Sequence, residues 1–150
     1  MRNITAIFIF LAIITLGNLS TAKAQSGQEL VDICSMIAGE EATYLKDFQI
    51  KLDEAKTGEE PPTARFSVVL SKNTQYRFTT CNSKDYSGQA ILKLFDNNRL
   101  LGTNFVVATG KTYPSFDFKC TSTGVYHIFV TFKEGDQGLA VAMLSFVKKL

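Results

Sequence analysis

The sequence contains a single histidine, His127, and this scarcity narrows the chemistry it can perform. A zinc site built on two histidines is excluded, and any nucleophile–histidine–acid triad would have to use His127. No Gly-x-Ser-x-Gly elbow or cysteine motif points toward it. Alternation with Tyr126 and Ile128 places His127 in the opposite phase of a strand, at the surface or under a helix, with a catalytic base as the alternative. We therefore expect a protein that is not an enzyme; a small hydrolase using surface carboxylates is the alternative.

Phosphate-binding and nucleic-acid-binding features are also missing. Gly110-Lys111-Thr112 spells the end of a phosphate-binding loop, but Phe105 occupies the position of the required upstream glycine, so we predict a hairpin turn there. Beyond residue 24, 14 basic residues balance 14 acidic ones. Since a nucleic-acid partner requires a clustered basic face, we expect none.

The sequence begins with the pattern of a secretory signal peptide. Arg2 precedes an apolar run over residues 4–16, and Ala22-Lys23-Ala24 forms a small-x-small cleavage pattern. The run is shorter than the about 20 residues of a membrane span, although an uncleaved anchor is the alternative. We predict a signal peptide over residues 1–24 and an exported protein without a membrane span after cleavage, in the periplasm, on the cell surface or secreted.

Cysteines are few: Cys34, Cys81 and Cys120. Their wide spacing fits no zinc motif, whereas an exported chain can form one disulfide and keep one thiol. Cys81 and Cys120 each end an aromatic strand, which favours a Cys81–Cys120 bridge. The two lie in different strand phases, however, so a bridge from Cys34 to either of them stays open.

Most of the sequence shows the period of two that is typical of half-buried strands. Turn signals separate about eight such segments: residues 48–52, 65–70, 75–81, 90–94, 101–108, 116–120, 126–132 and 139–147. Because no helical pattern lies between them, the sequence predicts an all-β antiparallel sandwich over residues 44–150. The charged segment 53–63 is expected to be an exposed loop.

One short amphipathic helix is predicted over residues 27–38, within an N-terminal helical segment 25–43. Ser26 and Glu29 form a capping box, and apolar residues follow at helical spacing. Residues 125–132 and 139–147 are apolar in both strand phases and need cover on their outer side. We expect the helix to cover them; the alternative is a second copy in a homodimer through these C-terminal strands.

The stretch Asp96-Asn97-Asn98 resembles the start of a calcium loop. An EF-hand would need an oxygen ligand and a glycine where Leu100 and Leu101 lie, so the pattern fails. Asp and Asn favour turns, and we predict a hairpin turn. An irregular calcium site with Asp85 or Asp117 is the alternative, but no metal or cofactor is expected.

Several segments in order resemble bacterial pre-peptidase C-terminal domains. They are Phe66-Ser67-Val68-Val69-Leu70, Tyr76-Arg77-Phe78, Leu92-Lys93-Leu94-Phe95-Asp96, Leu100 to Asn104, Phe116-Asp117-Phe118 and Thr123-Gly124-Val125-Tyr126-His127-Ile128. The resemblance implies a jelly-roll-like β-sandwich, a non-catalytic accessory of secreted enzymes that binds surfaces, glycans or proteins. Such domains normally accompany a peptidase, and this sequence has no room for one. The whole also resembles small exported proteins of Bacteroidetes-type bacteria.

Together these features predict an exported, non-catalytic binding or interaction module. Its ligand is a protein or a glycan at the cell envelope, and the alternative is a partner or inhibitor of an exported peptidase. Glycan binding would need solvent-facing aromatic rings, for which Tyr86, Phe105 and Tyr113 are the candidates because they lie in or near loops.

Overall fold

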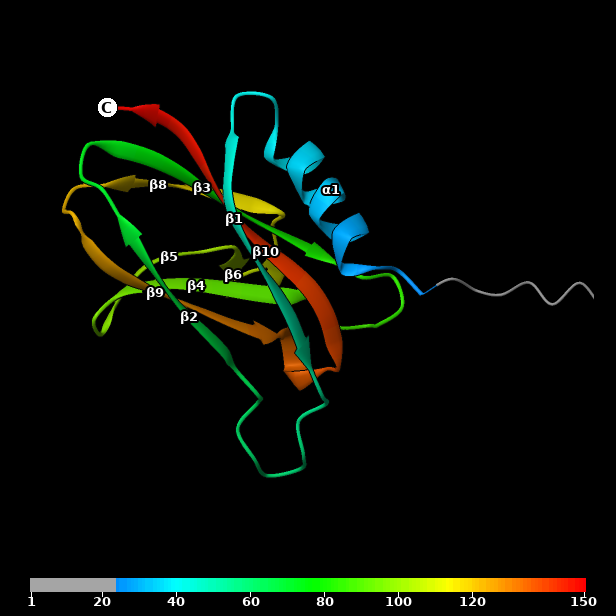
Figure 1. Ribbon diagram of the computed structural model, residues 1–150. Coiled ribbons are helices and arrows are strands. Elements are labelled where there is room, and N and C mark those ends of the chain that lie inside the picture. Colours follow the sequence, from blue (N-terminus) through cyan, green and yellow to red (C-terminus); the bar gives the residue numbers. More distant parts are fainter. Residues whose placement is uncertain (1–23) are drawn as a thin grey trace, which may run out of the picture.

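Two antiparallel sheets packed face to face form the protein, with one helix on the outside (Figure 1). The computed structural model describes residues 24–150, so all but the last residue of the predicted signal peptide lies outside the described part. The first sheet contains, in spatial order, β1 (Thr43–Leu52), β10 (Gly138–Lys149), β3 (Thr74–Asn82) and β8 (Ser115–Cys120). The second contains β2 (Ala64–Leu70), β9 (Gly124–Phe132), β4 (Ala90–Asp96) and β5 (Arg99–Thr103).

The strand order is that of a jelly roll. The chain crosses between the two sheets at nearly every connection, which gives β1-β10-β3-β8 in one sheet and β2-β9-β4-β5 in the other. The predicted eight-stranded, jelly-roll-like sandwich is therefore confirmed. A miniature hairpin of β6 (Phe105–Val106) and β7 (Lys111–Thr112) is inserted between β5 and β8.

The core lies between the sheets and follows from the period of two. Alternate residues of each strand point inward, where they bury aromatic and aliphatic side chains. The largest fully buried members are Phe78, Ile50, Leu70, Leu92, Leu94, Ile128 and Val130. Phe78 stacks on Phe116 with ring centroids 5.4 Å apart, and Phe48 contacts Phe66 across the sandwich at 4.5 Å.

Helix α1 (Gly27–Ala38) has the bounds predicted from the sequence. Ser26 caps it, since its Oγ accepts a hydrogen bond from the Glu29 N–H at 3.1 Å. Its buried face packs on β10 in the first sheet and forms a second apolar cluster: Leu30, Cys34, Ala38, Cys81, Val141 and Met143.

The helix covers only one of the two C-terminal strands that it was expected to cover. α1 lies over β10 but not over β9, because these strands belong to different sheets and the helix has only one apolar face. The outer side chains of β9, among them Val125 and Phe129, are consequently not buried by it. Both strands lie in the middle of their sheets, so a second copy could contact them only through their outer faces, and the homodimer expected as the alternative cover stays a prediction.

The preferred disulfide pairing, Cys81–Cys120, is wrong: the structure joins Cys34 of α1 to Cys81 of β3. The β3–β8 register places Cys120 opposite Thr74, seven positions and roughly 23 Å along the strand from Cys81. Cys120 also points into the sandwich core, while Cys81 points outward to the helix. Cys120 is a buried free thiol.

Arg77 fastens the C-terminal end of α1 to the first sheet. Its guanidinium donates to the carbonyl of Ala38 at 2.6 Å, to Glu41, and to both oxygens of Asp117 at 2.6 and 3.0 Å. The arrangement satisfies a carbonyl that would otherwise lack a partner at the helix end. The hydrogen bonds from Arg77 lower the pKa of the Glu41 and Asp117 carboxyls, and these carboxylates raise the pKa of Arg77.

The replacement Asp117→Asn is expected to reduce the loss of stability on acidification. A carboxyl whose pKa is lower in the folded than in the unfolded state stabilises the fold above its unfolded pKa, near 4, and this contribution disappears as the pH falls through the folded pKa. Its side chain is 33% exposed, so the effect at pH 7 should stay below about 1 kcal/mol. Urea denaturation at neutral and acidic pH measures it. An equal reduction in Asp53→Asn, in the exposed loop, would contradict the assignment.

The residues before α1 are held against the loop between β3 and β4. The Gln25 N–H donates to Asp85 Oδ2 at 2.8 Å, and the Gln25 side-chain oxygen accepts from the Lys84 N–H at 3.0 Å. Within residues 24–150 no helix is long and apolar enough to cross a membrane.

The stretch that resembled a calcium loop is a tight hairpin between β4 and β5. Asp96 is paired with Arg99 in the register, and Asn97 takes the left-handed conformation (φ 43°) that asparagine tolerates. The hairpin turn predicted at Asp96-Asn97-Asn98 is confirmed. The strand expected over residues 101–108 is instead interrupted at Asn104, after which the chain forms β6 and turns away.

Candidate binding surfaces

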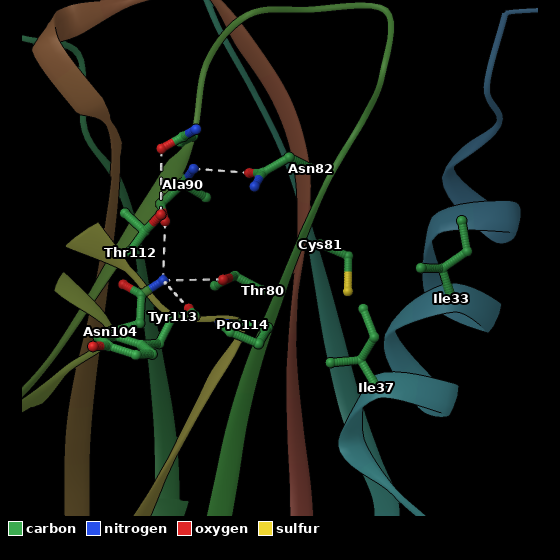
Figure 2. Close-up of a pocket in the computed structure, with 11 residues that line it drawn as sticks. Ile33, Ile37, Thr80, Cys81, Asn82, Ala90, Asn104, Thr112, Tyr113 and Pro114 are labelled. Atoms are coloured by element: carbon green, nitrogen blue, oxygen red, sulfur yellow. Dashed lines mark hydrogen bonds between the residues drawn. The ribbon is translucent and has the colours of Figure 1, made fainter.

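A cleft separates α1 from the β6–β7 hairpin, and we call it the α1 cleft (Figure 2). It has a volume of about 320 Å³. One wall comes from the helix, the floor from the ends of β3 and β4, and the other wall from the hairpin and the residues that follow it. Its lining consists of Ile33, Ile37, Thr80, Cys81, Asn82, Gln89, Ala90, Asn104, Thr112, Tyr113 and Pro114.

Asn104 builds the hairpin wall of this cleft. Its side chain is only 3% exposed, yet every polar atom is used. The Oδ1 accepts from the Leu92 N–H at 2.8 Å. The Nδ2 donates to Thr80 Oγ1 at 3.1 Å and to the carbonyls of Ala90 and Tyr113 at 3.0 Å (Figure 2). The side chain thus replaces strand pairing where β5 ends and joins the hairpin to both sheets.

The lining of the α1 cleft suits an uncharged ligand. Within the described residues 24–150 no charged side chain lines it; Ile37 is 43% exposed on one wall and Tyr113 is 50% exposed on the other. The side-chain amides of Asn82 and Gln89 supply polar groups nearby, although the Asn82 oxygen already accepts from the Ala90 N–H. A partly apolar hollow with a few amides is typical of sites for small neutral molecules.

The aromatic residues singled out from the sequence do not line one common site. Tyr113 alone belongs to the α1 cleft. Phe105 is half-buried on β6, in register with Thr112, and Tyr86 lies in the β3–β4 loop with the Lys51 ammonium 6.0 Å from its ring centre. The structure therefore brings one of these rings to a cavity and leaves the others apart.

The second candidate surface is the outer side of the second sheet, which we call the open face. Its outward residues form rows across neighbouring strands, as the register shows. One row is Arg65, Phe129, Lys93 and Thr103; the next is Ser67, His127, Phe95 and Leu100; the last is Val69 and Val125. Because α1 covers the other sheet, this is the sheet face without a helix (Figure 1).

The open face is unusually apolar for an uncovered strand surface. Val69 is 72% exposed, Val125 54% and Leu100 48%. Phe95 and Phe129 contact each other with centroids 5.1 Å apart, and both are half-buried. The sequence shows that β9 is apolar in both strand phases. It does not show which residues of β2, β4 and β5 lie beside β9, because the order of strands in a sheet cannot be derived from local patterns.

His127 lies at the centre of this face and contacts Ser67. Ser67 Oγ and His127 Nδ1 are 3.0 Å apart across β2 and β9. Among residues 24–150 no carboxylate is hydrogen-bonded to this histidine, and neither residue lines the α1 cleft. A catalytic triad would need an acid on the other ring nitrogen and a pocket for the substrate. The pair therefore has the geometry of a cross-strand hydrogen bond rather than that of a triad.

The carboxylates considered as calcium ligands lie apart, and each already accepts a hydrogen bond from another residue. Asp96 binds Arg99 at 2.7 Å, Asp117 binds Arg77, and Asp85 accepts from Gln25. No group of three metal-ligating side chains of the kind His, Cys, Asp or Glu forms in the part of the chain that the structure describes.

The fold places the chain among the antiparallel jelly-roll β-sandwiches. No protein-family model matches the sequence, and no curated protein matches it significantly. Among solved structures it is similar to Aeromonas hydrophila PliG, a periplasmic lysozyme inhibitor of g-type lysozyme, with a TM-score of 0.51 and 12% identity over 69% of this chain and 87% of PliG. At this identity the likeness shows the fold alone.

A second solved structure is the pre-peptidase C-terminal domain of collagenase from Bacillus anthracis. It aligns with a TM-score of 0.49 and 10% identity over 68% of this chain and 89% of that domain.

Proposed function

We propose that the protein is an exported, non-catalytic module that binds a protein partner through the open face. The observation that carries the proposal is the asymmetry of the sandwich, in which a helix tied by a disulfide covers one sheet and the other sheet presents aromatic and aliphatic residues to solvent. A flat apolar surface rimmed by polar groups is typical of protein interfaces, whereas small molecules prefer concave sites. Phe129, Phe95 and Arg65 are of the residue types that are enriched in protein interfaces.

Export is supported by two independent features. The sequence predicts a signal peptide over residues 1–24, and the Cys34–Cys81 disulfide suits the oxidising conditions of the periplasm or the exterior. If a second copy rather than another protein binds, the β9 side of the open face would be the contact, and a concentration-dependent dimer would be seen by analytical ultracentrifugation.

If the protein is non-catalytic, the single replacements Ser67→Ala and His127→Ala should not change its rate of substrate turnover. With ester, peptide and glycoside reporter substrates, purified wild-type protein and both variants should show the same rate as buffer. A turnover that the wild type supports and that both variants lose would establish the Ser67–His127 pair as catalytic.

A direct test of partner binding uses photo-crosslinking in the native cell. A photoreactive amino acid replaces Val125 or Leu100 on the open face, or Lys119 on the outer side of β8 as the matched control. We expect one protein to be crosslinked from both open-face positions and not from Lys119. Equal products from all positions, or none from the open face, would contradict the proposal.

A second candidate function is inhibition of an exported hydrolase. The supporting observation is that the same sandwich fold occurs in PliG, a lysozyme inhibitor, and the sequence resemblance points to the vicinity of peptidases. Purified protein would be titrated into g-type and c-type lysozymes and into secreted peptidases. Inhibition that Val125→Asp abolishes would identify the hydrolase as the partner; no inhibition at equimolar protein would remove this candidate.

Glycan binding is the alternative ligand class and belongs to the α1 cleft. Tyr113 is the aromatic residue that could stack on a sugar ring there. On a glycan array, binding that disappears in Tyr113→Ala but persists in Tyr86→Ala would favour a glycan ligand over a protein partner.

A further inference from the structure

We propose that the open face recognises an acidic segment of its protein partner, in which an apolar side chain lies between two carboxylates. The inference rests on the proposed function, because it names the chemistry of the partner that the same surface would bind. Its basis is the row that contains Arg65, Phe129 and Lys93, where a cation, an aromatic ring and a second cation follow one another across β2, β9 and β4.

The two cations of this row are exposed and take part in no ion pair of the described part of the chain. Arg65 and Lys93 flank Phe129 in the register, so their side chains emerge roughly 10 Å apart, which is two strand spacings. Among residues 24–150 the rows of the open face contain no carboxylate, and His127 lies in the neighbouring row.

The ring between the cations gives the site its apolar centre. The Arg65 guanidinium lies 5.0 Å from the centre of the Phe129 ring, and Phe129 in turn contacts Phe95. Stacking on a ring holds the guanidinium in place while leaving its edge N–H groups available for a carboxylate. An apolar partner side chain can rest on the two rings, with its acidic neighbours reaching Arg65 on one side and Lys93 on the other.

Carboxylates at both ends of the open face limit the length of an acidic partner. Asp96 lies at the hairpin end and is paired with Arg99. At the opposite end Glu60 and Glu134 line a hollow of about 460 Å³ together with Lys93. An extended polyanion or an anionic bilayer would meet these carboxylates, whereas a short acidic segment fits between them. This arrangement favours a protein segment over a membrane or a polyuronate.

The test uses a short synthetic peptide in which serines separate a central leucine from a glutamate on each side. In an extended peptide these three side chains lie on one face. The peptide is titrated into isotope-labelled protein and followed by the backbone amide signals. We expect shifts centred on Phe129, Lys93 and His127, and binding at least about tenfold tighter than that of the same peptide with glutamines.

Charge reversal provides the matched comparison. The double variant Arg65→Glu/Lys93→Glu should bind the acidic peptide at least about tenfold more weakly, as expected for the loss of two surface ion pairs. Lys119→Glu/Lys148→Glu changes the net charge equally on the first sheet, where both lysines are exposed, and should bind like the wild type. Circular dichroism and urea denaturation would verify that both double variants are folded.

Three results would overturn the inference. They are equal binding of the glutamine peptide, equal weakening by both double variants, and tighter binding of phosphatidylglycerol vesicles or polygalacturonate at the same residues. The crosslinked partner separates this inference from the proposed function. A partner that docks on the open face and binds Arg65→Glu/Lys93→Glu as tightly as the wild type would refute the acidic segment and leave the protein-binding function standing.

Discussion

Replacing Cys34 and Cys81 together with alanine is expected to lower the free energy of unfolding by about 4 kcal/mol, a large fraction of the roughly 5–15 kcal/mol that stabilises a domain. The bridge joins residues 47 positions apart, and closing a loop of this length lowers the conformational entropy of the unfolded chain, which destabilises the unfolded state. It also ties α1 to the sheet through the cluster with Val141 and Met143. Urea denaturation at neutral pH measures the loss.

Reduction gives the control for this prediction. A reducing agent should destabilise the wild type by a similar amount and leave the double alanine variant unchanged. Thiol titration of the oxidised, denatured wild type should find one reactive cysteine, which is Cys120. Three free thiols in the exported protein, or a bridge between Cys81 and Cys120 by peptide mapping, would contradict the pairing.

The replacement Asn104→Ala is expected to cost about 3 kcal/mol of stability, because it leaves several buried polar groups without partners. The Leu92 N–H and the carbonyls of Ala90 and Tyr113 all bond to this one side chain, and Leu92 is fully buried. We also expect faster amide exchange at Leu92 as the hairpin wall of the α1 cleft detaches. Urea denaturation and hydrogen exchange measure these effects.

Asn98→Ala serves as the matched control, since Asn98 is exposed in the β4–β5 turn and should change stability by less than about 0.5 kcal/mol. A loss for Asn104→Ala no larger than that of Asn98→Ala would show that water replaces the missing hydrogen bonds. The hairpin would then be held by its backbone contacts alone.

Local features were predictable from the sequence because they depend on neighbours along the chain. The Ser26 cap, the bounds of α1 and the turn at Asn97 follow from capping preferences and from the residues that tolerate positive φ. The sandwich followed from the period of two and from turn spacing. The jelly-roll topology was expected from the resemblance to pre-peptidase C-terminal domains, and the strand order confirms it.

Features that depend on strand order were not predictable. The Cys34–Cys81 bridge requires knowing that β3 lies under the helix and that its register places Cys120 at the far end. The cover of β9 was wrongly expected because β9 and β10 belong to different sheets despite their similar patterns. Residue Asn104 stood in the motif that carried the resemblance, but its role depends on strands that the sequence does not place side by side.

The contact between Gln25 and Asp85 gains a further meaning from the predicted cleavage after Ala24. In the uncleaved chain the Gln25 nitrogen is a neutral amide that donates to Asp85 at 2.8 Å. Removal of the signal peptide would turn this nitrogen into an α-ammonium group, which carries a positive charge at neutral pH, so the same contact would become an ion pair. Cleavage would thereby strengthen the contact that holds the residues before α1 against the β3–β4 loop. The N-terminus of the exported form would be held more firmly than that of the uncleaved chain.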